Sequence, residues 1–186
     1  MLYLVRHGES TWNVAGLLQG CTAHVPLTAR GRAQARAAAD VLSAEPVRAI
    51  VSSDQRRAAD TAAVIGARLG VPVATTAALR EQCHGAWEGG PAAGRAAVLA
   101  DADPDWAPPG GESARALAAR VATFLAGCGP DGTVLVSHGE TLRTALALLT
   151  GTDDRTVPPN GAVTSVVGGQ GGRGRAARHD RAGLLA

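Results

Sequence analysis

The stretch Leu2-Tyr3-Leu4-Val5-Arg6-His7-Gly8 opens with four apolar residues and then breaks into a basic turn. Such a short apolar run is typical of a buried strand, and the break predicts that the chain leaves its sheet near Arg6. The stretch Thr133–Val136 has the same form, because it ends at Ser137-His138-Gly139 and a helical pattern follows over Glu140–Leu149. Each stretch therefore predicts a strand with a histidine just beyond its carboxyl end.

Further short strands alternate with helices along the chain. Thr28 is a predicted N-cap for a helix over Ala29–Ser43. The other predicted strands are at Val47–Val51, Val71–Ala74, Val163–Val167 and after Arg173, and the other predicted helices are at Asp54–Leu69, Ala92–Leu99 and Glu112–Ala126. This alternation predicts an α/β fold with a mainly parallel central sheet, and we expect 1–186 to form a single domain.

The composition excludes several classes of protein. The chain has 186 residues, of which 46% are hydrophobic and 18% charged, so it can build a core and is not globally disordered. All 18 of its basic residues other than histidine are arginines. The absence of lysine from the sequence excludes a Walker-type phosphate loop and a lysine Schiff base. Arginine remains as the fixed cation, and its planar guanidinium suits bidentate binding of phosphate or carboxylate.

Charge, hydropathy and cysteine content bear on partners and location. A net charge of +2 and an aromatic content of 3% predict no nucleic-acid binding. No apolar run approaches the roughly 18 residues that span a bilayer, and only Leu2–Val5 precedes Arg6, so we expect no membrane segment and no signal peptide. The cysteines are odd in number, far apart in the sequence and without zinc-ligand spacing: Cys21, Cys83 and Cys128. This pattern favours a reducing compartment, and we expect a cytoplasmic protein.

Two features near the C-terminus have a plain structural interpretation. The segment 169–174 fits the pattern GxGxxG, but it follows no first strand and opens no helix, so a hairpin turn is favoured over a dinucleotide site. The surrounding arginines are interpreted as the solvated charges of an edge strand, with an acidic partner as the alternative. They are Arg173, Arg175, Arg178 and Arg181.

Polar clusters follow three of the predicted strands, at Arg6-His7, Ser52–Arg57 and His138-Gly139. Ligands of parallel sheets bind beyond the carboxyl ends of the strands, so we expect these three clusters to converge. Two guanidiniums and two imidazoles in one pocket suit a phosphate group. Nearby arginines also favour the neutral form of a histidine, which can then attack phosphorus as a nucleophile.

These clusters belong to a series of motifs that resembles the histidine phosphatase superfamily, whose founding members are cofactor-dependent phosphoglycerate mutases. Leu4–Asn13 resembles the family signature, and Ser52–Ala58 with Thr61-Ala62 resembles its second-strand motif. The other matching segments follow in order over nearly the whole chain: Leu27-Thr28, Gly31, Gln34-Ala35, Leu79–Glu81, Gly85, Trp87–Gly89, Pro109–Ser113, Val136–Gly139 and Arg143. The resemblance implies a phosphoglycerate mutase-like three-layer sandwich.

The resemblance also implies roles for five catalytic residues. His7 is the implied nucleophile, which becomes phosphorylated, and Glu81 the implied acid that protonates the leaving group and then activates water. The phosphoryl group is held by the remaining three, which are Arg6, Arg57 and His138. The alternatives are a core polar role for His138 and a surface charge for Glu81. Because the arginines replace a cation, we expect no metal and no cofactor.

Further residues are candidates for binding the substrate. Asn13 is implied to contact the phosphate, and the alignment favours Arg57 over its neighbour Arg56. The remaining candidates for substrate contact are Gln19, Gly20, Cys21, Thr22, Trp106, Gly139 and Glu140. This chain departs from the family pattern at His24, His84 and Glu140, which concern the rim of the site and hence the choice of substrate. A metal site formed by the histidines at 7, 84 and 138 is an alternative that the nearby arginines disfavour.

Three functions share this set of residues. The mutases of the family usually have longer segments over the site, whereas here only about twenty residues separate Glu88 from Gly110. We therefore expect freer access of water and hydrolysis of a small-molecule phosphomonoester by a monomer or homodimer. The alternatives are mutase-type phosphoryl transfer and the binding of a phosphorylated ligand without turnover.

Overall fold

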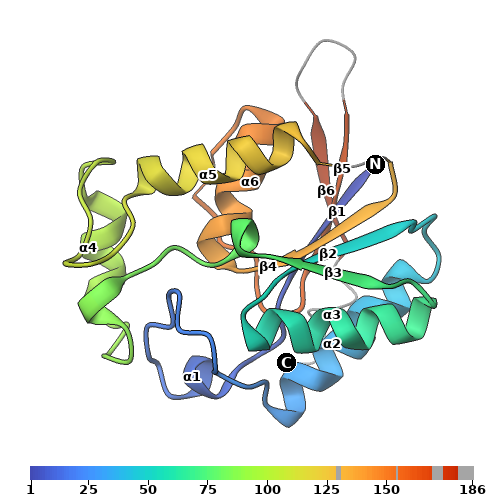
Figure 1. The fold of residues 1–186 in the computed structure, drawn as a ribbon, viewed down its shortest axis with the longest axis horizontal. Helices are drawn as coiled ribbons and strands as arrows, with labels where there is room; N and C mark the ends of the chain where they lie inside the picture. The colour runs from blue at the N-terminus through green and yellow to red at the C-terminus, as the bar shows by residue number, and fades with distance from the viewer. Residues whose placement is uncertain (129–130, 154, 169–173, 180–186) are drawn as a thin grey trace.

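The computed structural model describes residues 1–128, 131–153, 155–168 and 174–179, and its strands form one sheet in the order β3-β2-β4-β1-β5-β6 (Figure 1). The strands are β1 (Leu2–Arg6), β2 (Ala49–Ser53), β3 (Val73–Thr76), β4 (Thr133–Ser137), β5 (Val163–Val167) and β6 (Arg175–His179). Strands β3, β2, β4 and β1 pair in parallel, and β5 and β6 add an antiparallel edge. The prediction of a mainly parallel sheet is confirmed.

Helices cover both faces of this sheet. In Figure 1, α5 (Ala114–Ala126) and α6 (Gly139–Thr150) lie above the strands, and α2 (Ala29–Leu42) and α3 (Arg56–Leu69) lie below them. The shorter elements are α1 (Thr11–Val14), α4 (Arg95–Asp101) and the 3-10 helices η1 (Ala77–Leu79) and η2 (Gly85–Trp87). No helix among the described residues has the length and apolar character needed to cross a membrane.

The central strands are apolar on both faces, as parallel strands between two helical layers must be. In β1, Tyr3 and Val5 belong to the core beneath α2 and α3, whereas Leu4 belongs to the core beneath α5 and α6. Residues Val134, Leu135 and Val136 of β4 alternate in the same way. Two separate cores therefore lie on opposite faces of the sheet, and the expected three-layer sandwich is confirmed.

The boundaries of several elements differ from those predicted. Thr28 caps α2 as expected, by accepting a hydrogen bond from the backbone of Gly31. Asp54 does not begin α3, because its carboxylate is taken by the guanidinium of Arg80, and the helix starts two residues later with Gln55 as its N-cap. Helix α4 similarly begins at Arg95, three residues after the predicted start.

The C-terminal pair of strands forms as predicted, with β6 at the edge of the sheet. Arg175 and Arg178 lie exposed on β6, in keeping with a solvated edge strand. The predicted glycine-rich turn falls mainly on 169–173, which lie outside the described residues, as do the two other arginines of this segment at 173 and 181.

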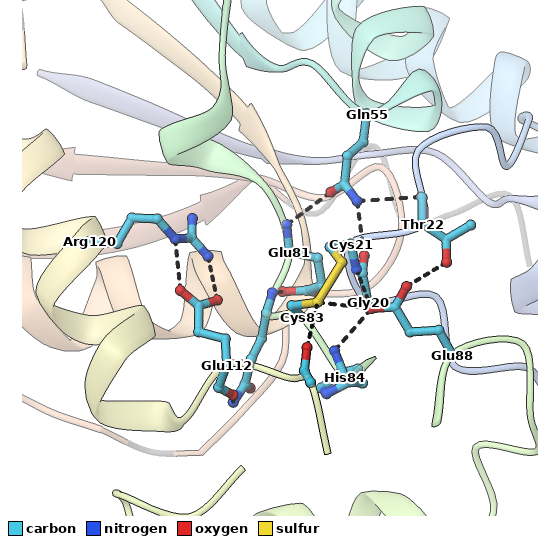
Figure 2. Close-up of a disulfide and its surroundings, with 12 residues drawn as sticks. Gly20, Cys21, Thr22, Gln55, Glu81, Cys83, His84, Glu88, Glu112 and Arg120 are labelled. Carbon is cyan, nitrogen blue, oxygen red and sulfur yellow. Dashed lines mark hydrogen bonds and ion pairs between the residues drawn. A yellow bond between two sulfur atoms is a disulfide. The ribbon is translucent and has the colours of Figure 1, made fainter. Parts of the chain in front are cut away.

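A disulfide joins Cys21 to Cys83, which are 62 positions apart in the sequence (Figure 2). The cysteine spacing did not predict this pair, because the fold places the segment after α1 beside the segment after η1. Distance along the sequence does not report distance in space. The disulfide ties together two segments that both reach the site described below.

We expect that loss of this disulfide lowers the free energy of unfolding by about 2–4 kcal/mol, because the bond closes a long loop in the unfolded chain. Urea unfolding with and without a dithiol reductant measures this difference. The double variant Cys21→Ser, Cys83→Ser is the control and should unfold at one midpoint in both conditions. A reductant effect of equal size in the variant would show that the disulfide is not its source.

Candidate active site

The carboxyl ends of β1, β2 and β4 meet at one edge of the sheet and open into a cavity of about 440 Å³. The convergence predicted for the three polar clusters is confirmed, since residues from each of them lie at this edge. The predicted site residues that line the cavity are Arg6, His7, Asn13, Gln19, Gly20, Arg57, Glu81, Gly139 and Glu140.

His7 follows β1 and is 2% exposed. Its Nδ1 lies 2.7 Å from the carbonyl oxygen of Gly8, and because a carbonyl only accepts hydrogen bonds, Nδ1 carries the proton. The lone pair therefore resides on Nε2. Burial, reinforced by the charges of Arg57 and Arg6, lowers the pKa of His7 well below its ordinary value of 6.5. The ring is thus neutral at neutral pH.

His138 follows β4 and is fully buried, with its ring centroid 5.1 Å from that of His7. Its Nε2 lies 2.8 Å from the hydroxyl oxygen of Ser53, and its Nδ1 has no hydrogen-bond partner among the described residues. Burial, followed by the charge of Arg57, holds the pKa of His138 well below 6.5. When the hydroxyl donates to Nε2, Nδ1–H becomes a donor with no protein acceptor.

Arg57 occupies the first turn of α3 and its side chain is completely buried. Its Nη1 donates to the carbonyl of Thr22 and its Nη2 to the carbonyl of Gly20, each at 2.8 Å. Burial lowers the pKa of Arg57 to about 10, a shift that the charges of nearby carboxylates oppose. The guanidinium therefore keeps its positive charge at neutral pH, in a place that water does not reach.

Arg56 and Arg57 have opposite environments in the structure, one exposed and the other buried. The side chain of Arg56 is 59% exposed and pairs with Asp60 one turn later, on the solvent side of α3. Arg57 lies in the cavity wall. The structure therefore places the arginine that the alignment favoured in the site, and its neighbour outside it.

Arg6 ends β1 and also lines the cavity. Its Nη1 donates to the carbonyl of Pro158 at 2.6 Å. The Nε atoms of Arg6 and Arg57 are both shielded from solvent, and neither has a hydrogen-bond partner among the described residues. Buried polar atoms are nearly always paired, so unpaired donors around one cavity indicate an anionic ligand.

Glu81 lies between η1 and η2, and the first turn of α6 holds its carboxylate. Its Oε1 accepts hydrogen bonds from the backbone of Gln82 at 2.9 Å and from both the backbone and the hydroxyl of Thr141 at 3.1 Å. Its Oε2 accepts from the backbone of Glu140 at 3.2 Å. Helix N-termini favour negative charge, and these donors orient the carboxylate beside the cavity that His7 also lines.

The segment around Glu81, called the acid segment below, is held on its other side by Arg120 of α5. Arg120 pairs with both carboxylate oxygens of Glu112 (Figure 2). Its Nη1 donates to the carbonyls of Ala78 and Arg80 at 2.8 Å and 3.1 Å. The segment that carries Glu81 is therefore fixed between two helices.

Three predicted substrate contacts lie away from the residues that line the cavity, and their roles stay predictions. Cys21 is part of the disulfide, and Thr22 faces the site through its carbonyl group while its hydroxyl donates to Glu88. Trp106 is 41% exposed and packs against Trp87 at 5.6 Å between ring centroids.

Three residues that shape the site were not predicted from the sequence. Asn160 donates from its side chain to the carbonyl of His7 at 3.0 Å. The carboxylate of Glu88 accepts from the backbone of Cys21 and of His84, and Gln55 is a buried amide beside Glu81.

The described part of the chain holds one group of three potential metal ligands within 4.8 Å of one another, formed by Cys21, Cys83 and Glu88. Two of these atoms are the sulfurs of the disulfide, which are not thiolates and so do not act as metal ligands. The histidines at 7, 84 and 138, which were the alternative metal site, do not form such a group among the described residues.

Comparison with known proteins agrees with this geometry. The family model of the histidine phosphatase superfamily (branch 1) matches residues 2–179. Glucosyl-3-phosphoglycerate phosphatase of Mycobacterium tuberculosis is 41% identical over 134 residues, which are 67% of this chain but only 58% of that protein. Probable phosphoglycerate mutase GpmB of Proteus mirabilis is 37% identical over 161 residues, covering 81% of this chain and 74% of the relative.

A solved structure of a mycobacterial glucosyl-3-phosphoglycerate phosphatase in complex with VO3 superposes on this chain with a TM-score of 0.78. The two are 35% identical over 94% of this chain and 96% of the other. The family match spans the strands, the strand-end clusters and the acid segment that together form the site. The chain therefore belongs to the histidine phosphatase superfamily.

Proposed function

We propose that this chain is a phosphomonoesterase that hydrolyses a small-molecule phosphate ester through a phosphohistidine on Nε2 of His7. The observation that carries the proposal is the state of His7, which is neutral, has its lone pair on Nε2, and lines the same cavity as Arg6 and Arg57, whose charges both act on it. A neutral imidazole among fixed cations can receive a phosphoryl dianion without charge repulsion.

The binding step uses donors that the protein itself leaves unpaired. The Nε–H groups of Arg6 and Arg57 and the Nδ1–H of His138 are suited to the three equatorial oxygens of the phosphoryl group. Donors already in place at the transition state need no reorganisation when charge redistributes, which is the main source of catalysis in phosphoryl transfer.

The chemistry proceeds in two displacements. In the first, Nε2 of His7 bonds to phosphorus, the phosphorus–oxygen bond to the alcohol breaks, and the carboxyl group of Glu81 gives its proton to the departing oxygen. In the second, the carboxylate of Glu81 takes a proton from water, whose oxygen bonds to phosphorus while the phosphorus–nitrogen bond breaks. The products are the alcohol and inorganic phosphate, and both residues return to their starting states.

The cavity supports an organic phosphate larger than phosphate alone, since its volume of about 440 Å³ extends to residues of α4. Its apolar outer wall includes Leu17, Leu18 and Leu99, and its polar wall includes Arg143 and Arg155. The names of the phosphatase relatives make glucosyl-3-phosphoglycerate the first substrate to assay.

Mutase-type transfer is the second candidate, favoured by the similarity to the Proteus mirabilis protein. It differs in product, because a mutase returns the phosphoryl group to a second hydroxyl and yields an isomeric ester. Release of inorganic phosphate in stoichiometric amounts from glucosyl-3-phosphoglycerate or 3-phosphoglycerate would support hydrolysis, and an isomeric ester without phosphate release would overturn it.

Replacing His7 with Ala should lower the rate of 4-nitrophenyl phosphate hydrolysis by about 10³-fold or more, because the covalent route is lost. Rapid quenching followed by mass spectrometry should find an acid-labile phosphate on His7 in the unmodified chain. A variant that retains its rate, or a phosphate group on another residue, would contradict the covalent mechanism.

Replacing Arg57 with Ala should raise the KM for phosphate esters, or the inhibition constant of inorganic phosphate, about 10- to 100-fold, because charged hydrogen bonds to the phosphoryl group are lost. Arg56→Ala is the matched control one residue away on the exposed side of α3, and its constants should stay within about twofold of the unmodified chain. Equal effects of the two substitutions would place the phosphate elsewhere.

The free energy of unfolding should fall as the pH drops below about 6.5, by up to about 1.4 kcal/mol per pH unit for each of His7 and His138. Their pKa values are lower in the folded than in the unfolded chain, so the unfolded chain binds more protons in this range and acid favours unfolding. Urea unfolding between about pH 7.5 and pH 5.5 in phosphate-free buffer measures the slope. The slope should fall by about half in His7→Ala, and an unaltered slope would show that His7 is not held neutral.

A further inference from the structure

We propose that Gln55 is a positioning residue that sets the place of the Glu81 carboxyl group relative to the bound phosphoryl group. The inference rests on the proposed function, because it concerns the proton that Glu81 gives to the leaving group. Nothing in the roles assigned so far requires a glutamine at this place, which is the N-cap of α3 and lies two residues after the end of β2.

The side chain of Gln55 is completely buried and connects two segments that are distant in the sequence. Its Nε2 donates to the carbonyl of Gly20 at 2.9 Å and more weakly to that of Thr22 at 3.4 Å. Its Oε1 accepts from the backbone N–H of Glu81 at 2.9 Å. Figure 2 shows the amide between the two segments, with one polar atom toward each.

The same amide also lies against the guanidinium that binds phosphate. The carbonyls of Gly20 and Thr22 accept hydrogen bonds both from Nε2 of Gln55 and from the guanidinium of Arg57. In addition, Nη2 of Arg57 lies 3.4 Å from Oε1 of Gln55. One carboxamide therefore links the backbone of the acid to the acceptors that orient the cation.

Only a carboxamide of this length meets both requirements. A donor is needed toward the carbonyls of Gly20 and Thr22, and an acceptor is needed toward the N–H of Glu81. Leucine offers neither group, methionine offers only a weak acceptor at its sulfur, and glutamate offers only acceptors. A buried N–H without a partner is strongly unfavourable, so loss of the acceptor should make the backbone at Glu81 move to find one.

Other contacts limit how far that movement extends. The disulfide from Cys21 to Cys83 and the hydrogen bonds of Glu88 still join the two segments when Gln55 is replaced. The loop that carries Gly20 should therefore stay in place, while the carboxyl group of Glu81 shifts by less than the length of one hydrogen bond. The predicted result is a defect in proton delivery rather than a loss of phosphate binding.

A defect in proton delivery depends on the leaving group. An alkoxide must be protonated as it departs, whereas a nitrophenolate leaves readily without a proton. A general loss of structure lowers the rates with both kinds of ester by the same factor. The ratio of the two rates therefore distinguishes a positioning role from a merely structural one.

The test compares kcat/KM for glycerol 3-phosphate and 4-nitrophenyl phosphate in the unmodified chain and in Gln55→Met. We expect the alkyl ester to lose about tenfold more than the aryl ester, a fraction of the full contribution of a general acid. In a Glu81→Ala background the ratio of the alkyl-ester to the aryl-ester kcat/KM should already have fallen. Adding Gln55→Met should change this ratio no further, because the two residues act through one step.

Two variants provide controls. Gln34→Met removes another buried glutamine, whose Oε1 accepts from the backbone of Glu9 at 2.7 Å, and should lower both rates by one factor. Gln55→Glu keeps an acceptor for the N–H of Glu81 and should hold the ratio within about twofold of the unmodified chain. Its carboxylate competes with phosphate for Arg57, so KM should rise for both esters.

Equal losses with both esters in Gln55→Met, or a further change of the ratio in the Glu81→Ala background, would overturn the role of Gln55. If Gln55→Met does not fold, a tenfold change of the ratio in Gln55→Glu would overturn it equally, since that variant retains the acceptor. An unmodified chain that hydrolyses neither ester overturns the proposed function and this inference together, whereas an active chain with an unchanged ratio in the variant overturns this inference alone.

Discussion

The rest of the site depends on how the buried guanidinium of Arg57 is satisfied. Its two terminal nitrogens donate to the backbone carbonyls of Gly20 and Thr22, and no carboxylate contacts them among the described residues. A carboxylate would cancel the charge and compete with a phosphate, whereas a carbonyl provides the hydrogen bond and leaves the charge in place. The cation is thereby kept buried, oriented and available for an anion.

The need for carbonyl acceptors at Arg57 accounts for much of the conformation of the loop between α1 and α2. Gly20 adopts a φ of +46°, and a Cβ there would lie 2.2 Å from Oε1 of Glu88, so only glycine turns its carbonyl toward Arg57. Glu88 then receives the next backbone N–H of the loop, and the disulfide at Cys21 ties it to the acid segment. The loop, the guanidinium of Arg57 and the segment that carries Glu81 form one interdependent unit around the proposed phosphoryl site.

The sequence was sufficient for the fold and for the convergence of the strand-end clusters on one cavity, because both follow from local patterns. An apolar run that ends in Arg6-His7 specifies a buried strand and a strand-end site at once, and the motif around Arg57 settled the choice between two adjacent arginines. The pairing of Cys21 with Cys83 and the amide of Gln55 could not be predicted in this way. Each depends on which loops meet in space, and no periodicity in the sequence records that contact.

The pairing of β1 with β4 has a consequence for how such a site can change over evolutionary time. Arg6 and Ser137 are the last register partners of the two strands, and the rings of the histidines that follow them lie 5.1 Å apart between centroids. A slip of one residue in either strand would turn a histidine to the opposite face of the sheet. The relative position of the two histidines is therefore set by the register of two buried strands, and the loops around the cavity can differ in length without altering that register.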